Sequence, residues 1–424
     1  MTQWIAPTAT GPVTGTVRLP GSKSMTARAL VLSALGDGPS TIRRALRARD
    51  TTLMAAALQA LGVRIGAASD DAWTVEPGPL RGPAVVDVGL AGTVMRFVPP
   101  VAALADGTVT FDGDPHARSR PLRPILDALR ALGVSIEASP AGGLPLIVHG
   151  TGQIDGGEAV IDASESSQFV SGLLLSAARF IKGLVLRHDG PPVPSAPHLR
   201  MTTHMLGAAG VVVDESVPDV WVVEPGRVRG RSWDIEPDLS GAVPFFAAAI
   251  VTGGTVTLAD WPTDSWQPVG RLTELLTNLG AEVTQSGAGL TVRGTGRLRG
   301  VTADLSDVSE LTPVIAALAA LAGGPSELRG VAHIRGHETD RIAALARELR
   351  AVGTDVQEHP DGLTIRPGPL RPTTVDTYAD HRMAHAAAVL GLAVKGLVLS
   401  DVACTAKTLP EFPELWADLV TTRS

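Results

Sequence analysis

The sequence contains a single cysteine, Cys404, among its 424 residues. One cysteine excludes an intrachain disulfide framework and a zinc site built from several cysteines. Lysine is also scarce: there are four, Lys23, Lys182, Lys395 and Lys407, and arginine supplies nearly all other positive charge. Because Lys23 stands between two serines, it is a candidate for a site that needs a compact ammonium group and not a forked guanidinium.

Long apolar runs and an excess of positive charge are missing as well. The most apolar stretch, residues 313–322, is too short to cross a bilayer, so no membrane segment is expected. No secretory signal stands out, and a cytoplasmic location is the expected default. The formal net charge of −7 gives no general affinity for nucleic acid. Anionic ligands would have to be bound by local clusters of lysine and arginine.

What the sequence does contain is internal repetition. A helix that ends at a glycine and returns as a strand occurs five times, at 57–65, 128–136, 205–213, 275–283 and 348–356. The spacing of 70 to 77 residues is long enough for several elements in each copy. We expect the glycine to end each helix as its C-cap. A strand that runs into a Gly/Pro turn follows each copy, at 73–82, 144–152, 220–230, 290–300 and 363–372.

A third segment completes the repeat: a polar stretch opens an Ala/Leu-rich helix, and a glycine turn and an apolar strand follow. Six copies of it account for the whole chain, and they predict two groups of three with a midpoint near residues 236–238. The helices are apolar nearly all round and should be buried. Their polar first turns could converge and bind anions. The strand before Lys23 is expected to complete the second group, in the last copy.

The clearest of these helix starts is the stretch Pro20–Leu30. A turn at Pro20-Gly21 precedes a predicted helix over Met25–Leu35, so Lys23, Ser24 and Arg28 lie on or just before its first turns. Free N–H groups, two cations and two hydroxyls suit an anion, although a capped surface helix is the alternative. The Gly-x4-Gly-Lys spacing of a Walker A loop is missing.

Several other helix starts carry chemically useful groups. Gly92 lets a ligand approach backbone N–H groups, and the acidic Glu310 is predicted at the start of an apolar helix, partly buried and basic. The His381 and His385 pair has i, i+4 spacing without the glutamate of a zinc protease, so no metal site is expected. Glycine pairs at 150–152 and 294–296 lie between strands and do not indicate a dinucleotide site. Together these residues suit proton transfer on a phosphorylated substrate.

Seven motifs occur in order along the chain: LPGSKSMTAR, LAGTVMR, SRPLRP, SSQF, HETDR, DHRMA and CTAKTLPEF. Together they resemble the 3-phosphoshikimate 1-carboxyvinyltransferase (EPSP synthase) family over essentially the whole chain. The resemblance implies an α/β (α+β) fold of two inverted, barrel-like domains, with six βαβαββ repeats, three per domain. One domain would comprise residues 1–21 plus 236–424 and the other residues 22–235, with the active site in the cleft between them.

The resemblance also implies the reaction. The enolpyruvyl group of phosphoenolpyruvate would pass to the 5-hydroxyl of shikimate 3-phosphate, by addition and elimination through a non-covalent tetrahedral ketal, with release of phosphate. This step belongs to the shikimate pathway, which leads to chorismate and the aromatic amino acids, and the family is inhibited by glyphosate. No metal or cofactor is expected, and the partners are the two substrates of a cytoplasmic monomer.

Site residues follow from the motifs by resemblance. Residues for shikimate 3-phosphate would be Lys23, Ser24, Arg28, Ser166, Ser167, Gln168, Ser195, Glu310 and His337. Residues for phosphoenolpyruvate would be Lys23, Gly92, Arg120, Gln168, Arg341, Arg382 and Lys407. The residues that move protons would be Lys23, Glu310 and Glu338, and which of them protonates the methylene carbon stays open.

Three positions depart from the commoner family pattern. Glu310 replaces an aspartate, His337 a lysine and His198 a tyrosine, and His337 makes the charge of its contact depend on pH. Two alternatives remain: the sister transferase that acts on UDP-N-acetylglucosamine, and a non-catalytic anion-binding protein of the same fold. The sister pattern has a reactive cysteine in a loop of its first domain, where residues 110–125 contain none. The non-catalytic alternative would not require the two glutamates together with intact cationic motifs.

Overall fold

The computed structural model describes residues 3–69 and 72–421. By its internal contacts the chain divides into two compact units, of which unit 1 comprises Met1–Leu19 with Glu236–Ser424, and unit 2 comprises Pro20–Ile235. The chain therefore passes between the units twice, at residues 19–20 and at residues 235–236. The boundaries expected from the sequence lay at residues 21–22 and 235–236.

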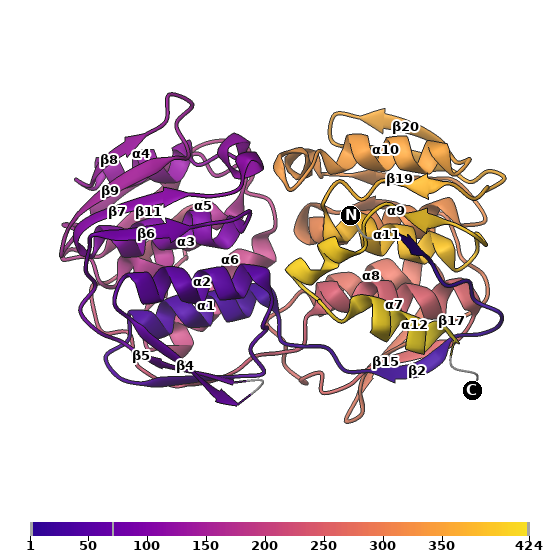
Figure 1. The fold of residues 1–424 in the computed structure, drawn as a ribbon, viewed down its shortest axis with the longest axis horizontal. Coiled ribbons are helices and arrows are strands. Elements are labelled where there is room, and N and C mark those ends of the chain that lie inside the picture. Colours follow the sequence, from indigo (N-terminus) through magenta and orange to yellow (C-terminus); the bar gives the residue numbers. More distant parts are fainter. Residues whose placement is uncertain (1–2, 70–71, 422–424) are drawn as a thin grey trace. The chain divides into compact units, whose positions relative to one another are not determined.

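Unit 2 contains three four-stranded sheets, and one of them takes an edge strand, β14, from outside its own repeat (Figure 1). Their strands are β14 (Ser232–Asp234), β3 (Ser40–Arg43), β5 (Ala72–Glu76) and β4 (Arg64–Ser69); β6 (Ala84–Asp87), β7 (Asp106–Asp112), β9 (Leu146–Thr151) and β8 (Ser135–Ala138); and β10 (Gly157–Ile161), β11 (Leu184–His188), β13 (Val220–Val223) and β12 (Val213–Asp214). The helices are α1 (Lys23–Ala34), α2 (Arg49–Ala60), α3 (Gly92–Ala103), α4 (Arg123–Ala131), α5 (Ser167–Ala177) and α6 (Ala196–Ala208), with a 3-10 turn η1 (Pro115–Ser119).

Unit 1 repeats this arrangement. Its sheets contain β2 (Thr14–Val17), β15 (Thr255–Leu258), β17 (Gly289–Gly294) and β16 (Ala281–Ser286); β18 (Thr302–Asp304), β19 (Ser326–Arg329), β21 (Gly362–Arg366) and β20 (Asp355–His359); and β1 (Trp4–Ile5), β23 (Val398–Leu399) and β22 (Thr374–Val375). The helices are α7 (Leu239–Thr252), α8 (Val269–Asn278), α9 (Thr312–Ala320), α10 (Arg341–Ala351), α11 (His381–Gly391) and α12 (Phe412–Thr421), with 3-10 turns η2 (Ser306–Leu311), η3 (Ala332–Gly336) and η4 (Ala403–Lys407).

All five four-stranded sheets share one pattern of pairing. The first two strands are parallel and the other neighbours antiparallel, as in β6–β7 and β7–β9. Where the parallel strands are consecutive, in β6–β7, β10–β11 and β18–β19, the apolar helix between them supplies the crossover that a parallel pair needs. The predicted α/β fold of βαβαββ repeats is therefore confirmed, with one difference: the sixth sheet has three strands among the described residues.

The parallel edge strands are exchanged between the units. The strand β2 precedes α1 in sequence but pairs with β15 of unit 1, and β14 precedes α7 but pairs with β3 of unit 2. The N-terminal strand does pair within the second group, as expected, but in its first repeat and not in its last. The last repeat instead receives β1, which runs antiparallel to β23.

Burial follows the predicted pattern of apolar residues. Every residue of α3 is buried, and α3 packs against α5, as α9 packs against α11 in unit 1. The outer helices α4 and α10 bury only one face. Five glycines predicted as C-caps, Gly62, Gly133, Gly210, Gly280 and Gly353, all have φ between 82° and 108°. A side chain is strained in that left-handed region, so glycine is the residue that ends these helices.

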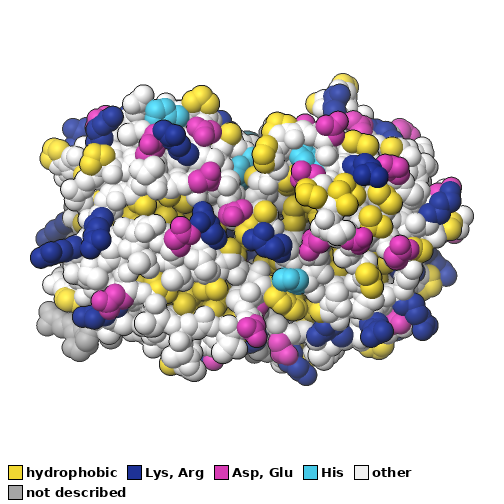
Figure 2. Space-filling view, turned by 180° about the vertical axis from the view of Figure 1, so that it is seen from behind, with side chains coloured by type: hydrophobic (Ala, Val, Ile, Leu, Met, Phe, Trp, Pro, Cys, Tyr) yellow, Lys and Arg dark blue, Asp and Glu magenta, His cyan; other side chains and the backbone are white. Residues whose placement is uncertain are grey.

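The surface carries both signs of charge. On the face shown in Figure 2, lysine and arginine side chains are interspersed with aspartate and glutamate. Among the described residues, many exposed charged side chains form pairs, such as Arg64 with Glu76 and Arg187 with Glu158. Such pairs contribute little to stability, and they leave the surface mixed in charge. Of the described helices, none is long and apolar enough to cross a membrane.

Candidate active site

In unit 2, two of the buried helices, α1 and α3, begin without a side-chain cap among the described residues. Helices α1 and α3 begin after Ser22 and Ala91, and neither residue forms a side-chain cap with the part of the chain that the structure describes. At α5, the Ser166 hydroxyl accepts from the backbone N–H of Gln168 at 3.2 Å. Helix starts without caps, each with partial positive charge, are typical of anion sites.

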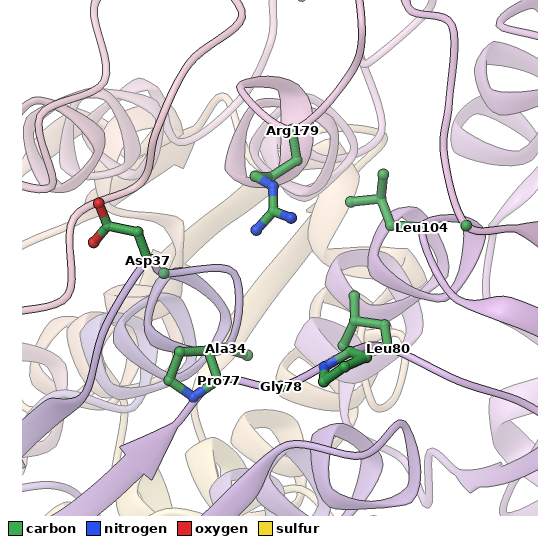
Figure 3. A pocket seen from close by; sticks show the side chains of 10 residues that line it. Ala34, Asp37, Pro77, Gly78, Leu80, Leu104 and Arg179 are labelled. Carbon is green, nitrogen blue, oxygen red and sulfur yellow. The ribbon is translucent and has the colours of Figure 1, made fainter.

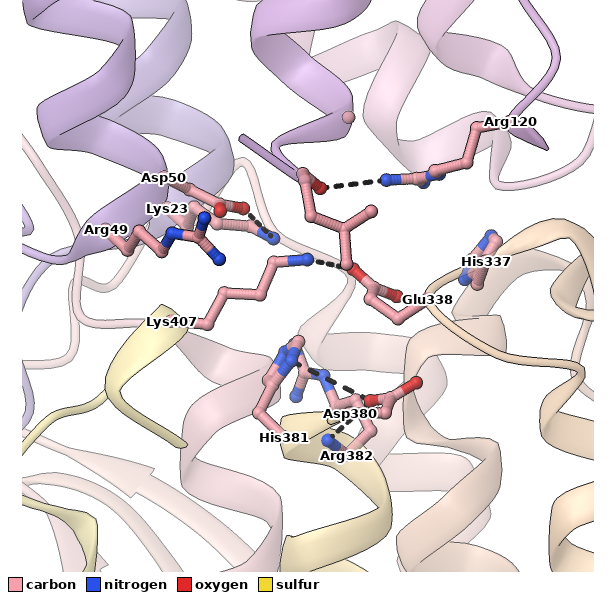
Figure 4. A network of polar contacts seen from close by, with 12 residues as sticks. Lys23, Arg49, Asp50, Arg120, His337, Glu338, Asp380, His381, Arg382 and Lys407 are labelled. Carbon is pink, nitrogen blue, oxygen red and sulfur yellow. Dashed lines mark hydrogen bonds and ion pairs between the residues drawn. The ribbon is translucent and has the colours of Figure 1, made fainter. Parts of the chain in front are cut away.

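Lys23 is the first residue of α1 and lies beside a carboxylate that the sequence analysis missed. Its Nζ lies 3.4 Å from Oδ2 of Asp50, whose side chain is only 3% exposed (Figure 4). The signal for Asp50 was present, because it is the acidic residue in the first turn of α2. A buried carboxylate holds the ammonium in one place and so positions Lys23.

Gly92 is brought together with two other predicted residues. A Cβ built on Gly92 would lie 3.1 Å from Nη2 of Arg120, 3.1 Å from Oε1 of Gln168 and 2.8 Å from Nη1 of Arg96. Arg120 is buried and donates to the carbonyl of Leu90 at 3.1 Å. Arg96, to which the motifs assigned no role, donates from Nη1 to the carbonyl of Gly92 and to Oε1 of Gln168, both at 3.4 Å.

Arg28 is more deeply buried than a surface cation. Its guanidinium donates to Thr202 Oγ1 at 2.8 Å, to the carbonyl of Ser24 at 2.9 Å and to that of His198 at 3.1 Å. Burial lowers the pKa of Arg28 to about 9, because desolvation disfavours the charged form. Arg28 thus joins the first turn of α1 to α6. A nearby anion would compensate its buried charge.

Two predicted serines flank this region. Ser167 is the first residue of α5 and is buried. Ser195 immediately precedes α6 with φ of 56° and ψ of 45°, a left-handed conformation that is rare for a residue other than glycine. Such strained residues cluster at functional sites. No sequence pattern around Ser195 predicts this conformation.

In unit 1, Arg341 is the centre of an ion-pair network. Its Nε donates to Asp380 Oδ2 at 2.8 Å and its Nη2 to Asp380 Oδ1 at 3.2 Å and to Glu338 Oε2 at 2.8 Å. Arg341 is 1% exposed, and these carboxylates raise its pKa above the ordinary arginine value despite burial. Asp380, whose side chain is fully buried, also caps α11 by accepting from the backbone N–H of Arg382. The guanidinium is therefore fixed in one orientation.

Glu338 lies between two cations. Besides Arg341 it accepts a hydrogen bond from Nζ of Lys407, and both side chains of this second pair are 8% exposed (Figure 4). Glu338, predicted to transfer protons, thus lies in direct contact with Lys407, predicted to bind substrate, although the two are 69 positions apart in sequence. A carboxylate beside an ammonium provides a short path for a proton.

Glu310 lies slightly before its predicted place. It belongs to the 3-10 turn η2 and precedes α9, which begins at Thr312, so it is not on the apolar helix itself. Its side chain is 32% exposed, and Oε2 lies 3.2 Å from Nη1 of Arg341 and 3.6 Å from Nε of Arg382. The helix was predicted too early because Val308 has non-helical backbone angles that interrupt it.

The two histidines of this region were only partly recognised. Nδ1 of His337 accepts from Nη1 of Arg341 at 2.9 Å, since a guanidinium can only donate. His333, which the sequence analysis did not single out, packs edge-on against His337 with ring centres 5.9 Å apart. Its buried Nε2 has no hydrogen-bond partner among the described residues, and burial lowers the pKa of His333 to about 4. His333 is a neutral polar group at the edge of the network.

Arg382 completes the predicted cations of unit 1. Its Nη1 and Nη2 donate to the carbonyl and hydroxyl of Ser240 at 2.8 and 2.6 Å. Three carboxylates (Glu310, Glu338, Asp380) therefore face three cations (Arg341, Arg382, Lys407) within this unit. No group of three His, Cys, Asp or Glu side chains within residues 3–69 and 72–421 is arranged to hold a metal ion.

Open helix starts with lysine and arginine in unit 2, and carboxylates paired with guanidiniums in unit 1, define a protein that binds small anions and can move protons. The model of the EPSP synthase (3-phosphoshikimate 1-carboxyvinyltransferase) family matches residues 7–416, and the chain belongs to that family.

Individual relatives agree with the family match. The chain is 53% identical to a 3-phosphoshikimate 1-carboxyvinyltransferase from Mycobacterium ulcerans, over 98% of this chain and 97% of that protein. Two solved structures of EPSP synthase from Acinetobacter baumannii have the same fold, with TM-scores of 0.81 and 0.79. They are 24% and 23% identical, and each match covers 98% of this chain and 97% of the other.

Proposed function

We propose that this chain transfers the enolpyruvyl group of phosphoenolpyruvate to the 5-hydroxyl of shikimate 3-phosphate, as a cytoplasmic monomer of the shikimate pathway. The activity follows from membership of the family, and 53% identity over nearly the full length carries it. In the addition step, the 5-oxygen bonds to C2 of phosphoenolpyruvate, the hydroxyl loses its proton and C3 gains one. In the elimination step, C3 loses a proton and the C2–O bond to phosphate breaks.

We assign phosphate binding to unit 2. The uncapped starts of α1 and α3, with Lys23 and Arg120 beside them, suit the phosphate of phosphoenolpyruvate. The Gly92 backbone would form one wall of that subsite, since Arg120 and Gln168 surround the position of its missing Cβ. Ser24, Arg28, Ser166, Ser167 and Ser195 would hold the phosphate and carboxylate of shikimate 3-phosphate.

We assign the carboxylate of phosphoenolpyruvate and the proton transfers to unit 1. Arg341, Arg382 and Lys407 would bind the carboxylate, since all three are held by neighbouring acceptors. Glu310 would accept the proton of the 5-hydroxyl, because it is the most exposed of the three carboxylates. Glu338 would protonate C3, with Lys407 as its proton partner. The substrates would then draw the two units together around one site.

One assay tests the proposal. Phosphate release from phosphoenolpyruvate is measured with shikimate 3-phosphate, with UDP-N-acetylglucosamine and with neither. Release only with shikimate 3-phosphate is expected. Release with the nucleotide sugar would indicate the sister transferase, and binding of both anions without release would indicate a non-catalytic protein.

A further inference from the structure

Some polar contacts in this chain satisfy the end of a helix and need no further role. In the hollow of unit 2 that Figure 3 shows, Arg179 donates to the carbonyl of Leu35 at 2.7 Å, where α1 ends. A polar contact of unit 1 has a different setting, because it lies beside the site. Tyr378, the one tyrosine of the sequence, pairs with Glu348 only two residues before Asp380.

The chain makes a strained turn immediately before Asp380. Tyr378 and Ala379 both have φ of 52°, and the backbone N–H of Asp380 donates across them to the carbonyl of Thr377 at 2.8 Å. Tight turns with two left-handed central residues favour glycine, asparagine or aspartate, because other side chains are strained there. With tyrosine and alanine in these places, neighbouring contacts have to hold the turn.

The strongest of those contacts come from α10. The Tyr378 hydroxyl donates to Oε1 of Glu348 at 2.6 Å, and Oε2 of the same carboxylate accepts from the backbone N–H of Asp376 at 3.1 Å. Glu348 is 6% exposed, so its desolvated oxygens gain from both donors. Burial and the bond to Glu348 raise the pKa of Tyr378, so its hydroxyl keeps its proton at neutral pH and remains a donor.

Both ends of the turn are tied to one helix. Asp380 at its end accepts two hydrogen bonds from Arg341, the first residue of α10. Glu348, which holds the start of the turn, lies seven residues later on α10. Residues seven apart lie about two turns from each other on the same face of a helix. The face of α10 that holds the strained turn is therefore the face that carries Arg341.

We propose that Tyr378 and Glu348 are positioning residues of the active site. They hold the turn that fixes Asp380, and through Asp380 they orient Arg341 and Arg382 toward the carboxylate of phosphoenolpyruvate. Asp380 acts on Arg341 through its side-chain bonds, and on Arg382 by accepting from its backbone N–H at the start of α11. The proposal rests on the proposed function, in which both arginines bind that carboxylate. The competing explanation is that the tyrosine hydroxyl only stabilises unit 1.

The test uses Tyr378→Phe in the full chain, which removes one hydroxyl and keeps the ring. The KM for phosphoenolpyruvate should rise at least ~5-fold, because the guanidiniums lose part of a charge-assisted contact, and that for shikimate 3-phosphate should change less than ~2-fold. Glu348→Gln, which turns an NH₂ group toward one of the two donors, should shift the KM values in the same direction. Steady-state kinetics with each substrate varied in turn measure both constants, and each variant covers the other if one does not fold.

Relief of the strain tests the role of the turn itself. Ala379→Gly removes a Cβ from a left-handed position, so the backbone no longer favours other angles that the tyrosine contact must oppose. In the Tyr378→Phe background, this second substitution should lower the raised KM for phosphoenolpyruvate at least ~2-fold. No recovery would contradict an effect that passes through the turn.

Ser326→Ala is the matched control for loss of a hydroxyl that serves the fold alone. Ser326 Oγ, 2% exposed at the start of β19, accepts from the backbone N–H of Val301 at 3.0 Å. This variant should lower the melting temperature and leave both KM values unchanged. If Tyr378→Phe and Glu348→Gln behave in the same way, the proposal is overturned while the proposed function stands. A native chain without transferase activity would refute the proposed function, and this proposal with it.

Discussion

Replacing Gly92 by alanine probes the proposed wall of the phosphoenolpyruvate subsite. The new methyl group would lie 2.8 to 3.1 Å from the tips of Arg96, Arg120 and Gln168. Real Cβ atoms rarely approach so closely, so at least one tip must shift by a few tenths of an ångström. The charges stay the same, and only the position of the donors and the free space in front of the backbone change.

The magnitude follows from those contacts. A hydrogen bond to a charged group contributes about 1.5 to 3 kcal/mol, so partial misalignment of one is expected to cost about 1.4 kcal/mol. The KM for phosphoenolpyruvate should then rise about tenfold. The KM for shikimate 3-phosphate should stay nearly unchanged. Inhibition by glyphosate should weaken at least as much, because we expect this inhibitor of the family to lie against the same backbone wall and to fit it more tightly. Steady-state kinetics with each substrate varied in turn measure all three.

Gly207→Ala is the matched control. Gly207 lies in α6 of the same unit, and a Cβ there would meet nothing within 4 Å. This variant should gain roughly 0.5–1 kcal/mol of stability, because alanine favours a helix over glycine, with unchanged kinetics. If Gly92→Ala weakened shikimate 3-phosphate and left phosphoenolpyruvate and glyphosate untouched, the assignment of Gly92 would be wrong.

Four further outcomes are expected. Lys23→Met should lower turnover at least ~10²-fold in a chain that still folds, as for loss of a proton donor or charge stabiliser. Its melting temperature should fall, because the buried Asp50 loses this cation; near-normal turnover would reject the role of Lys23. Glu310→Gln should abolish turnover while shikimate 3-phosphate still binds. As a control, substitution of an exposed glutamate, Glu274→Gln, should leave both turnover and binding unchanged. Equal losses of binding and turnover would make Glu310 a positioning residue. Small-angle scattering should show a smaller radius of gyration with shikimate 3-phosphate and an unreactive phosphoenolpyruvate analogue, and an unchanged radius would contradict closure. Burial beside Arg382 and Arg341 holds the pKa of His385 well below 6.5, so as pH falls the unfolded chain binds a proton at this residue before the folded chain does, and the free energy of unfolding drops below about pH 6.5 by up to ~1.4 kcal/mol per pH unit. In urea unfolding measured against pH, His385→Phe should lose this part of the pH dependence, and the new ring also suits the contact with Phe412. An unchanged pH dependence would exclude His385 as its source.

The repeats could be predicted from sequence because their signals are local. A glycine such as Gly62 ends its helix whatever surrounds it, since its φ of 101° excludes other residues sterically. The partner of β2 could not be predicted, because the same apolar pattern fits the edge of any of the six sheets. The position of Glu310 was missed for a related reason: the break at Val308 in the turn before α9 leaves no trace in the apolar pattern.

The candidate site, like the fold, could be predicted from the sequence only in part. Its motifs identified the cations, but not what fixes them, because the partners are distant in sequence. Arg341 and Asp380 are 39 residues apart, and Glu338 and Lys407 are 69 apart. The sequence offers no period or spacing that would pair them. A neutral histidine such as His333 was missed because its burial, and not its neighbours in sequence, determines its charge.

The buried helices α7 and α11 of unit 1 differ at their starts from α1 and α3 of unit 2. In unit 1, Asp238 caps α7 and Asp380 caps α11, so their free N–H groups are already satisfied by carboxylates of the chain. In unit 2, the starts of α1 and α3 have no such acid at the cap. Equal dipoles therefore favour an anion more at the starts of α1 and α3 than at those of α7 and α11. The starts of α1 and α3 support our proposal that phosphate groups bind at unit 2. Unit 1 holds its arginines in ion pairs with carboxylates, so a substrate carboxylate that joins them must share those guanidiniums.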